Sequence, residues 1–138
     1  NALEEKIFGA MATFIQKVHR AADASLAETG LTPAQFFVLA TLSRRRECRQ
    51  TELARILGVT AGNISQLVTK LEQAGLVKRV GDGKANLVAL LPDGDAMVRV
   101  LMPEHERFLR AQFDRLRVEE RKNLLALLEK LGGDQTGR

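Results

Sequence analysis

Amide and hydroxyl side chains recur along residues 60–74 at the spacing of one helix face. At 100° of rotation per residue, the apolar side chains fall within about 100° of arc; these core-facing residues are Ile64, Leu67, Val68 and Leu71. The opposite side carries Gly62, Ser65, Gln66, Thr69 and Gln73, flanked by Asn63 and Lys70. Gln and Asn pair with adenine edges, hydroxyls bond bases or phosphates, and a lysine can meet a phosphate. These residue types favour nucleic-acid recognition by this face.

The first turn of the same segment, Thr60-Ala61-Gly62-Asn63, is a second signal. Gly62 costs about 1 kcal/mol relative to Ala inside a helix. Small residues nevertheless let the start of a helix approach phosphate, whose charge the free backbone amides attract. The alternative is an ordinary surface helix, but such a helix would favour Glu and Lys, and Glu72 is the only acid between Thr60 and Ala74.

The positive charge of the chain gathers around this segment. The net charge is +4 over 138 residues. Residues 44–84 hold nine Lys and Arg against four acids, a balance of +5, whereas the rest holds twelve against thirteen, a balance of −1. A localised basic patch suits a polyanion-binding surface, although charge alone also fits a merely soluble basic face.

Catalysis, metal binding and membrane insertion find little support in the residue pattern. No Gly-rich phosphate loop, HExxH or CxxC spacing occurs, and the two histidines, His19 and His105, are far apart. We therefore expect no enzyme, no metal site and no cofactor. The longest apolar runs are about five residues, against about 20 needed to span a bilayer. With one cysteine and no visible signal peptide, a cytoplasmic protein is the simplest interpretation.

Cys48 leaves two interpretations open. It lies among four arginines, and positive neighbours lower the pKa of a thiol, which would suit an oxidation switch. The arginines are Arg44, Arg45, Arg46 and Arg49. A structural, unreactive Cys48 is the interpretation that we favour.

Helix signals surround the polar face. An amphipathic helix is predicted over 2–28 and ends at Gly30. Thr32-Pro33-Ala34-Gln35 forms a capping box that begins the next helix. A short helix around 51–57 stops at Gly58, and Thr60 caps the helix that ends at Gly75. Apolar runs at 76–80 and 85–90 flank Asp82-Gly83, which is a strong hairpin signal.

The remaining residues predict two further helices and a tail. Pro92 begins a helix to about Arg117, which Pro103 should kink or break. A final helix covers about Val118 to Leu131. We expect one domain over 1–138, with a DNA-binding lobe at 31–91, dimerisation helices at 1–30 and 92–131, and a flexible tail at 132–138. The fold class is mainly α with a small β-hairpin wing, that is, a winged helix-turn-helix lobe plus terminal dimerisation helices.

The sequence TELARILGVTAGNISQLVTKLEQAGLVKR, followed by LVALLPDG and LRVEERKNLLALLEKL, resembles the MarR family of bacterial transcription regulators. LTPAQFFVLATL fits the second helix of that family. The resemblance implies a homodimeric repressor with two lobes on palindromic double-stranded DNA. It implies these DNA contacts: Gln50, Thr51, Thr60, Ala61, Gly62, Asn63, Ser65, Gln66, Thr69, Lys70 and, in the wing, Lys84.

The resemblance has two departures and one further implication. The family wing usually carries Asp followed by two arginines, whereas here Asp82-Gly83-Lys84 matches, and Leu91 replaces the usual capping Thr. Lysine has less bidentate capacity than arginine. The family also implies a small aromatic or phenolic effector, although the sequence identifies no ligand-binding residues.

The two terminal helices each carry a stripe of large apolar side chains, and a winged lobe of about fifty residues is too small to cover both. These stripes support a dimer independently, unless the two helices pack on each other in a monomer. Two other functions stay open. One is a winged-helix protein-interaction module without DNA binding. The other is an oxidation-responsive regulator acting through Cys48, although the peroxide sensors of the family place their cysteine in the first helix, where this chain has none.

Overall fold

The computed structural model describes residues 2–81 and 86–132. The chain divides into two compact units, Asn1–Glu104 and His105–Arg138. The first unit contains α1 (Ala2–Leu26), the 3-10 turn η1 (Ala27–Thr29), α2 (Pro33–Arg45), α3 (Gln50–Leu57) and α4 (Ala61–Gln73), with strands β1 (Glu47–Arg49), β2 (Val77–Val80) and β3 (Leu87–Leu90). Helix α5 (Pro92–Gln112) continues into the second unit, which also contains α6 (Val118–Gly132).

Local capping signals determine where α2 and α4 begin, as predicted. At α2, the Thr32 hydroxyl accepts from the Gln35 backbone N–H at 3.1 Å, and the Gln35 side chain accepts from the Thr32 N–H at 2.9 Å. At α4, Thr60 Oγ1 accepts from the Asn63 N–H at 3.1 Å. Gly58 and Gly75 follow α3 and α4 with φ of 70° and 78°, a left-handed conformation that glycine adopts at little cost.

The small sheet has three strands, whereas the sequence predicted a two-stranded hairpin. Strand β3 lies between β1 and β2, and both pairings are antiparallel. The register places Val88 opposite Cys48 of β1 and opposite Arg79 of β2. The expectation missed β1 because three residues are too few to show strand alternation, so only the distant partner β3 defines it.

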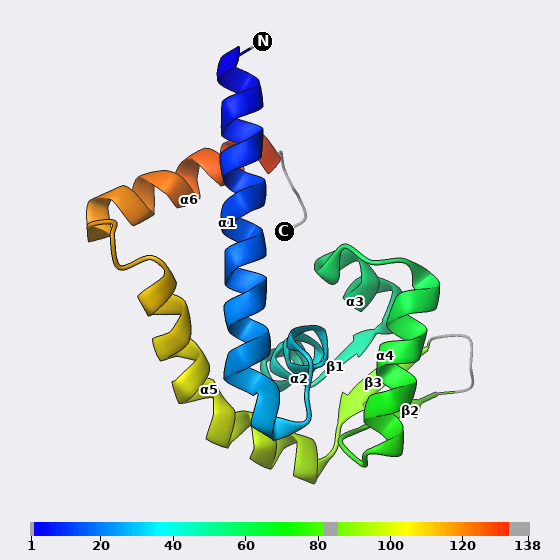
Figure 1. Ribbon diagram of the computed structural model, residues 1–138. Helices are drawn as coiled ribbons and strands as arrows, with labels where there is room; N and C mark the ends of the chain where they lie inside the picture. The colour runs from blue at the N-terminus through cyan, green and yellow to red at the C-terminus, as the bar shows by residue number, and fades with distance from the viewer. Residues whose placement is uncertain (1, 82–85, 133–138) are drawn as a thin grey trace. The chain divides into compact units, whose positions relative to one another are not determined.

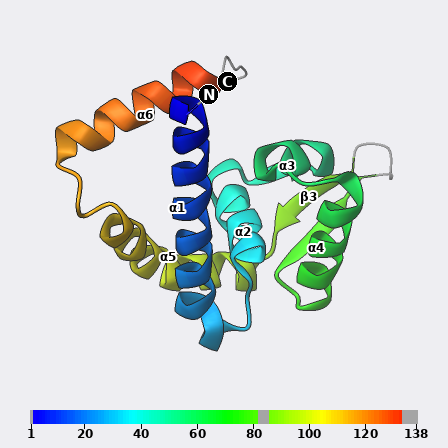
Figure 2. The same cartoon turned by 45° about the horizontal axis from the view of Figure 1, so that its top comes forward.

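The core of the first unit lies where α2, α3, α4 and the sheet meet (Figure 1). Figure 2 shows α3 and α4 near one another, with β3 behind them. The fully buried side chains at the centre come from every one of these elements and include Leu39, Leu53, Ile64, Val68 and Val88. Burial of these side chains is the main favourable contribution to folding and holds α3 and α4 as a helix-turn-helix pair.

The start of helix α5 lies close to Leu76, the residue just before strand β2. A Cβ at Gly94 would overlap the carbonyl oxygen of Leu76 and lie 2.8 Å from Leu90 Cδ1. The Leu91 N–H donates to the Leu76 carbonyl at 3.0 Å, which ties the same two segments together. Gly94 therefore permits a close approach of α5 that a larger residue would prevent.

The C-terminal part differs from the sequence prediction in two ways. Of the kink or break predicted at Pro103, the break does not occur, since α5 continues through this residue. The helix also ends at Gln112 rather than near Arg117, since short i to i+3 bonds such as Leu116 N–H to the Phe113 carbonyl, 3.0 Å, form a turn there. The predicted final helix is confirmed, one residue longer, to Gly132; the rest of the predicted tail, residues 133–138, lies outside the described residues.

Candidate nucleic-acid interface

The start of α4 is exposed and free of acidic side chains in its first turn. Ala61, Gly62 and Asn63 are all exposed. A Cβ built at Gly62 would meet only Thr60 Oγ1, at 4.0 Å, so no neighbour within the chain requires glycine here. The first backbone N–H groups of a helix lack helical acceptors and carry partial positive charge. This end of α4 is therefore a suitable contact for an anion.

The polar side chains of α4 fall into two sets. Ile64, Val68 and Leu71 are buried, as predicted, and Leu67 packs against the same core while partly exposed. We define the outer set as the exposed side chains Asn63, Gln66 and Lys70. We define the inner set as Ser65 and Thr69, which are half-buried. The sequence pattern placed both sets on one outward face, whereas burial separates them.

Arg79 of β2 binds the inner set. Its Nη2 lies 3.0 Å from the Ser65 carbonyl, 3.4 Å from Ser65 Oγ and 3.1 Å from Thr69 Oγ1. Its Nη1 donates to Glu72 Oε1 at 2.9 Å, and its Nε donates to Gln50 Oε1 at 3.2 Å. We call Arg79, Gln50, Ser65, Thr69 and Glu72 the Arg79 cluster. This cluster connects β2 to both helices of the helix-turn-helix.

The sequence alone did not indicate the role of Arg79, which counted only as one charge of the basic patch. Two of its partners, Ser65 and Gln50, lie 14 and 29 residues away in the chain. Glu72, the one acid of α4, also accepts from the Arg79 backbone N–H at 3.3 Å. The Glu72 carboxylate is thus paired with Arg79, which reduces its repulsion of a polyanion.

The start of α3 adds two predicted contacts. Gln50 is half-buried within the Arg79 cluster, and Thr51 beside it is exposed. Further along α3, the Glu52 carboxylate accepts from Arg55 at 2.7 Å and from Arg45 at 3.1 Å. These hydrogen bonds, that of Arg55 foremost, hold the pKa of Glu52 below its usual range. Two arginines of the basic patch therefore share one carboxylate, and the partial exposure of the group makes the pairing weak.

Lys84, the predicted wing contact, lies outside the described residues. The remaining predicted contacts surround the start of α4 or the Arg79 cluster. Thr60, Ala61, Gly62 and Asn63 form the first turn, and Gln66 and Lys70 follow on the exposed side. The structure thus places nine of the eleven predicted residues on two adjoining helices, α3 and α4, and a tenth, Thr60, at the N-cap of α4.

Cys48 is buried, with 6% of its surface exposed, and lies in the core opposite Val88. Burial raises the pKa of the Cys48 thiol, and the opposing charge of Arg45 does not outweigh it. Arg45 does act to lower this pKa, as the sequence suggested, but desolvation of the thiolate has the larger effect, so the environment does not favour an oxidation switch. An inert structural role is the role that this environment favours.

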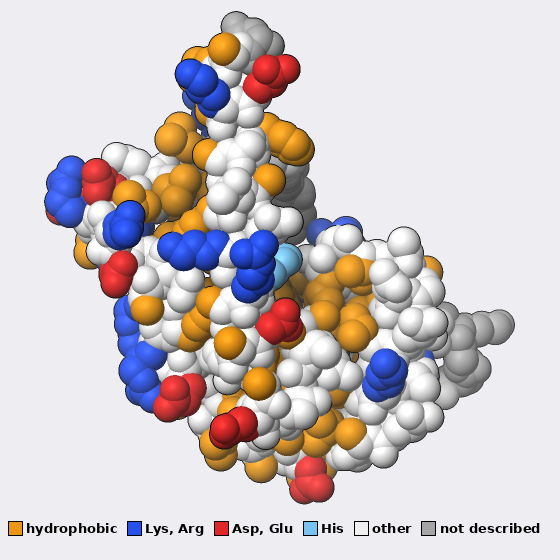
Figure 3. Space-filling model, in the orientation of Figure 1, with side chains coloured by type: hydrophobic (Ala, Val, Ile, Leu, Met, Phe, Trp, Pro, Cys, Tyr) orange, Lys and Arg blue, Asp and Glu red, His pale blue; other side chains and the backbone are white. Residues whose placement is uncertain are grey.

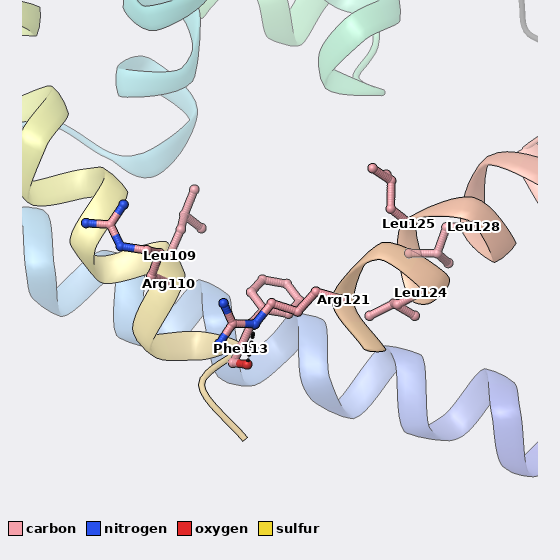
Figure 4. Close-up of a pocket in the computed structure, with 7 residues that line it drawn as sticks. All are labelled: Leu109, Arg110, Phe113, Arg121, Leu124, Leu125 and Leu128. Carbon is pink, nitrogen blue, oxygen red and sulfur yellow. Dashed lines mark hydrogen bonds between the residues drawn. The ribbon is translucent and has the colours of Figure 1, made fainter. Parts of the chain in front are cut away.

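The second unit has an apolar hollow of about 320 Å³ between the end of α5 and α6 (Figure 4). Its lining is Leu109, Arg110, Phe113, Arg121, Leu124, Leu125 and Leu128. Arg121 Nε donates to the Phe113 carbonyl at 3.1 Å, which joins α6 to the turn that follows α5. Helix α6 has no buried residue, and Leu125, Leu127 and Leu131 are more than half exposed.

The part of the chain that the structure describes holds neither a metal site nor a membrane-spanning helix. In residues 2–81 and 86–132, His, Cys, Asp and Glu side chains form no group of three or more able to hold a metal ion. Over those same ranges, no helix has the length and apolar character needed to cross a membrane.

The fold and the exposed start of α4 define a winged helix-turn-helix protein. A family model described as the MarR family matches residues 29–85. An uncharacterized HTH-type transcriptional regulator of Bacillus cereus is 32% identical over 132 residues, covering 95% of this chain and 90% of that protein. The chain belongs to the MarR family of transcriptional regulators, whose members act through a DNA-binding winged helix and are not enzymes.

Solved structures agree with this assignment. Sco3205, a MarR family transcriptional regulator from Streptomyces coelicolor in complex with DNA, has a TM-score of 0.87 and 26% identity, covering 99% of this chain and 91% of that chain. The fold is also that of Bordetella bronchiseptica BpsR, with a TM-score of 0.82 and 24% identity over 94% of this chain and 96% of that one.

Proposed function

We propose that the chain is a homodimeric repressor that binds a palindromic operator and is released by a small effector. The observation that carries the proposal is the exposed start of α4, whose first turn carries no acid and two small residues. Phosphate contacts position such a helix, and polar side chains on it discriminate bases. A cytoplasmic location follows from this role.

The proposed contacts divide by chemistry. Thr60, Ala61 and Gly62 bring the backbone of α4 to a phosphate, and Asn63 and Gln66 contact base edges. Lys70, Lys84, Thr51 and the inner set contact the sugar-phosphate backbone. Residues 31–91 act as the DNA-binding lobe within one MarR-like domain.

Exposed apolar surface supports the homodimer. Figure 3 shows apolar side chains over α1, and the largest exposed ones of that helix are Leu3, Ile7, Phe8, Met11 and Ile15. Helix α6 is exposed along its length in the same way. Contiguous apolar surface of this kind favours association, so residues 1–30 and 92–131 serve as the dimerisation helices. A two-fold dimer would set two α4 helices about 34 Å apart, one turn of DNA.

The effector is proposed as a small aromatic or phenolic acid. The solved structure of BpsR concerns regulation of its DNA binding by 6-hydroxynicotinic acid. Such a ligand would change the separation of the two α4 helices and so lower DNA affinity. Titration of the protein–DNA complex with hydroxylated aromatic acids tests this part, and a panel with no effect would contradict it.

Selection of bound duplexes from a random DNA pool at near-physiological salt tests the operator. A palindrome with half-sites about one helical turn apart is the expected product. Sequence-blind, salt-sensitive binding would contradict base reading, and no retention of DNA would indicate a protein-interaction module instead.

Charge reversal at Lys70 and Lys84 should weaken binding to all duplexes and make the salt dependence shallower, because each phosphate contact releases counterions.

A further inference from the structure

We propose that Arg79 is a positioning residue that makes Gln50, Ser65 and Thr69 act as hydrogen-bond donors toward the DNA backbone. This inference rests on the proposed DNA binding and assigns a role to the strand beside α4. Hydrogen bonds to Gln50, Glu72 and Thr69 hold the Arg79 side chain against the protein rather than extended toward solvent.

Each of the three guanidinium nitrogens of Arg79 donates to an acceptor of the protein. Nη1 binds Glu72 at 2.9 Å, Nε binds Gln50 at 3.2 Å, and Nη2 binds the Ser65 carbonyl at 3.0 Å and Thr69 Oγ1 at 3.1 Å. Its side chain is only 28% exposed. A guanidinium held in this way has a fixed geometry and little freedom to follow a phosphate.

A guanidinium only donates hydrogen bonds, so every oxygen that it contacts must accept. For Gln50, this fixes Oε1 toward Arg79 and leaves the amide NH₂ to donate elsewhere. For Ser65 and Thr69, it occupies a lone pair of each hydroxyl oxygen and leaves the hydroxyl proton to donate. Phosphate oxygens are acceptors, so all three groups are matched to the DNA backbone.

The outer set differs in this respect. Asn63 and Gln66 are exposed, and no hydrogen bond of either side chain is found among the described contacts. An amide with both its donor and its acceptor available can pair in bidentate fashion with adenine. Arg79 thus separates two tasks: the inner set and Gln50 fix the position of α4 on the DNA backbone, and the two amides of the outer set, Asn63 and Gln66, contact bases.

The strand itself supplies a matched control. Neighbouring side chains of a strand point to opposite faces, so Lys78 carries the same charge as Arg79 on the other face of β2, where it is exposed. Lys78→Ala removes a charge and keeps the Arg79 cluster. Arg79→Lys keeps the charge and loses the planar fork of donors.

The experiment compares the wild type, Arg79→Lys and Lys78→Ala on the duplex selected from the random pool and on a scrambled duplex, over a range of salt. We expect Arg79→Lys to weaken binding to both duplexes about tenfold with an unchanged salt dependence. Lys78→Ala should weaken binding less. Wild-type affinity in Arg79→Lys, or equal losses in the two variants, would overturn the positioning role.

A double-mutant cycle with Thr69→Val separates positioning from a purely structural effect. Thr69→Val removes the hydroxyl with nearly the same shape and leaves Arg79 and the sheet in place. If Arg79 acts through Thr69, the loss in the double variant is smaller than the product of the two single losses. Independent losses would show that Arg79 acts on folding or contacts DNA itself, and circular dichroism melting identifies the former.

The two proposals fail in different ways. If the wild type selects no duplex, the operator proposal fails, and the positioning role fails with it. If the wild type selects a palindrome and Arg79→Lys binds it as tightly, only the positioning role fails. NMR exchange of the Arg79 Nε–H in the free protein adds a readout without DNA: it should be slow in the wild type and faster in Gln50→Ala.

Discussion

Single side chains of α4 differ in how much of their hydrogen-bonding capacity remains available. Ser65 and Thr69 already accept from Arg79, whereas Asn63 and Gln66 lie exposed beside them. Sequence specificity in a major groove depends on side chains that match the donors and acceptors of a base edge. The two amides of the outer set, Asn63 and Gln66, rather than the whole polar face, are therefore where we place discrimination between bases.

Gln66→Ala tests this assignment. We expect the affinity for the selected duplex to fall about tenfold or more and that for a scrambled duplex to change little, because a bidentate pair contributes about 1–3 kcal/mol of discrimination. Fluorescence titration of both duplexes measures the ratio. Gln73→Ala, an exposed glutamine at the other end of α4, is the control. Equal losses on both duplexes would mean that Gln66 contacts the backbone.

Cys48 allows a prediction about pH. Because burial raises the pKa of the thiol, the native protein holds less thiolate at pH 8 than the unfolded chain. Alkylation by iodoacetamide at that pH should therefore be at least about tenfold slower in native than in urea-unfolded protein. The contribution of the buried neutral thiol to the free energy of unfolding is fully present at pH values below the ordinary pKa of cysteine. This contribution is lost as the pH rises through the raised pKa of Cys48 in the folded protein. Equal alkylation rates, or peroxide-dependent release of DNA that Cys48→Ser abolishes, would restore the oxidation-switch interpretation.

Among the helices and strands, local signals predicted more than long-range contacts did. Thr32, Gln35 and Thr60 act within one helical turn, so the sequence alone could place the starts of α2 and α4. Strand β1 exists because residues 47–49 pair with 87–89, and this pairing has no local signature. The Arg79 cluster was missed for the same reason, since its members come from α3, α4 and β2. The sequence therefore predicted which helices carry the candidate DNA contacts, but it did not predict the division of these residues into inner and outer sets.

A substitution at Gly62 tests whether the start of helix α4 approaches DNA closely. Its surroundings leave room for a Cβ, so Gly62→Ala should stabilise the protein by up to about 1 kcal/mol through helix propensity. The same methyl group should lower DNA affinity, because it separates the start of α4 from the phosphate. Urea unfolding and DNA titration of one variant measure both effects.

Gly9→Ala provides the matched control for Gly62→Ala. Gly9 is an exposed helical glycine of α1, and a Cβ there meets nothing within 4 Å. It should give a similar gain in stability and leave the affinity for a single half-site unchanged, because binding of one lobe to a half-site does not depend on the dimerisation helices. Unchanged affinity in Gly62→Ala as well would show that the first turn of α4 does not approach DNA closely.

For the molecule as a whole, the distribution of surface types suggests a division of labour. The excess positive charge lies in residues 44–84, whereas large exposed apolar side chains gather on α1 and α6. A basic surface suits a polyanion and an apolar surface suits a second protein chain. If the basic surface binds DNA and the apolar surface binds a second copy of the chain, DNA affinity depends on dimerisation. Two lobes joined in one dimer bind a palindrome far more tightly than either lobe alone.

Leu125→Arg tests that dependence. Leu125 is 58% exposed on α6, so the change should leave the fold of each chain intact and place a charge in the proposed dimer interface. We expect dimer dissociation to become at least about tenfold easier, as for a buried apolar contact residue. Affinity for the palindrome should fall with it, while affinity for a single half-site stays the same. Analytical ultracentrifugation and titration of both duplexes measure this, with Asn123→Arg, an exposed polar position of the same helix, as the control. A dimer that persists in Leu125→Arg would place the interface elsewhere than this face of α6.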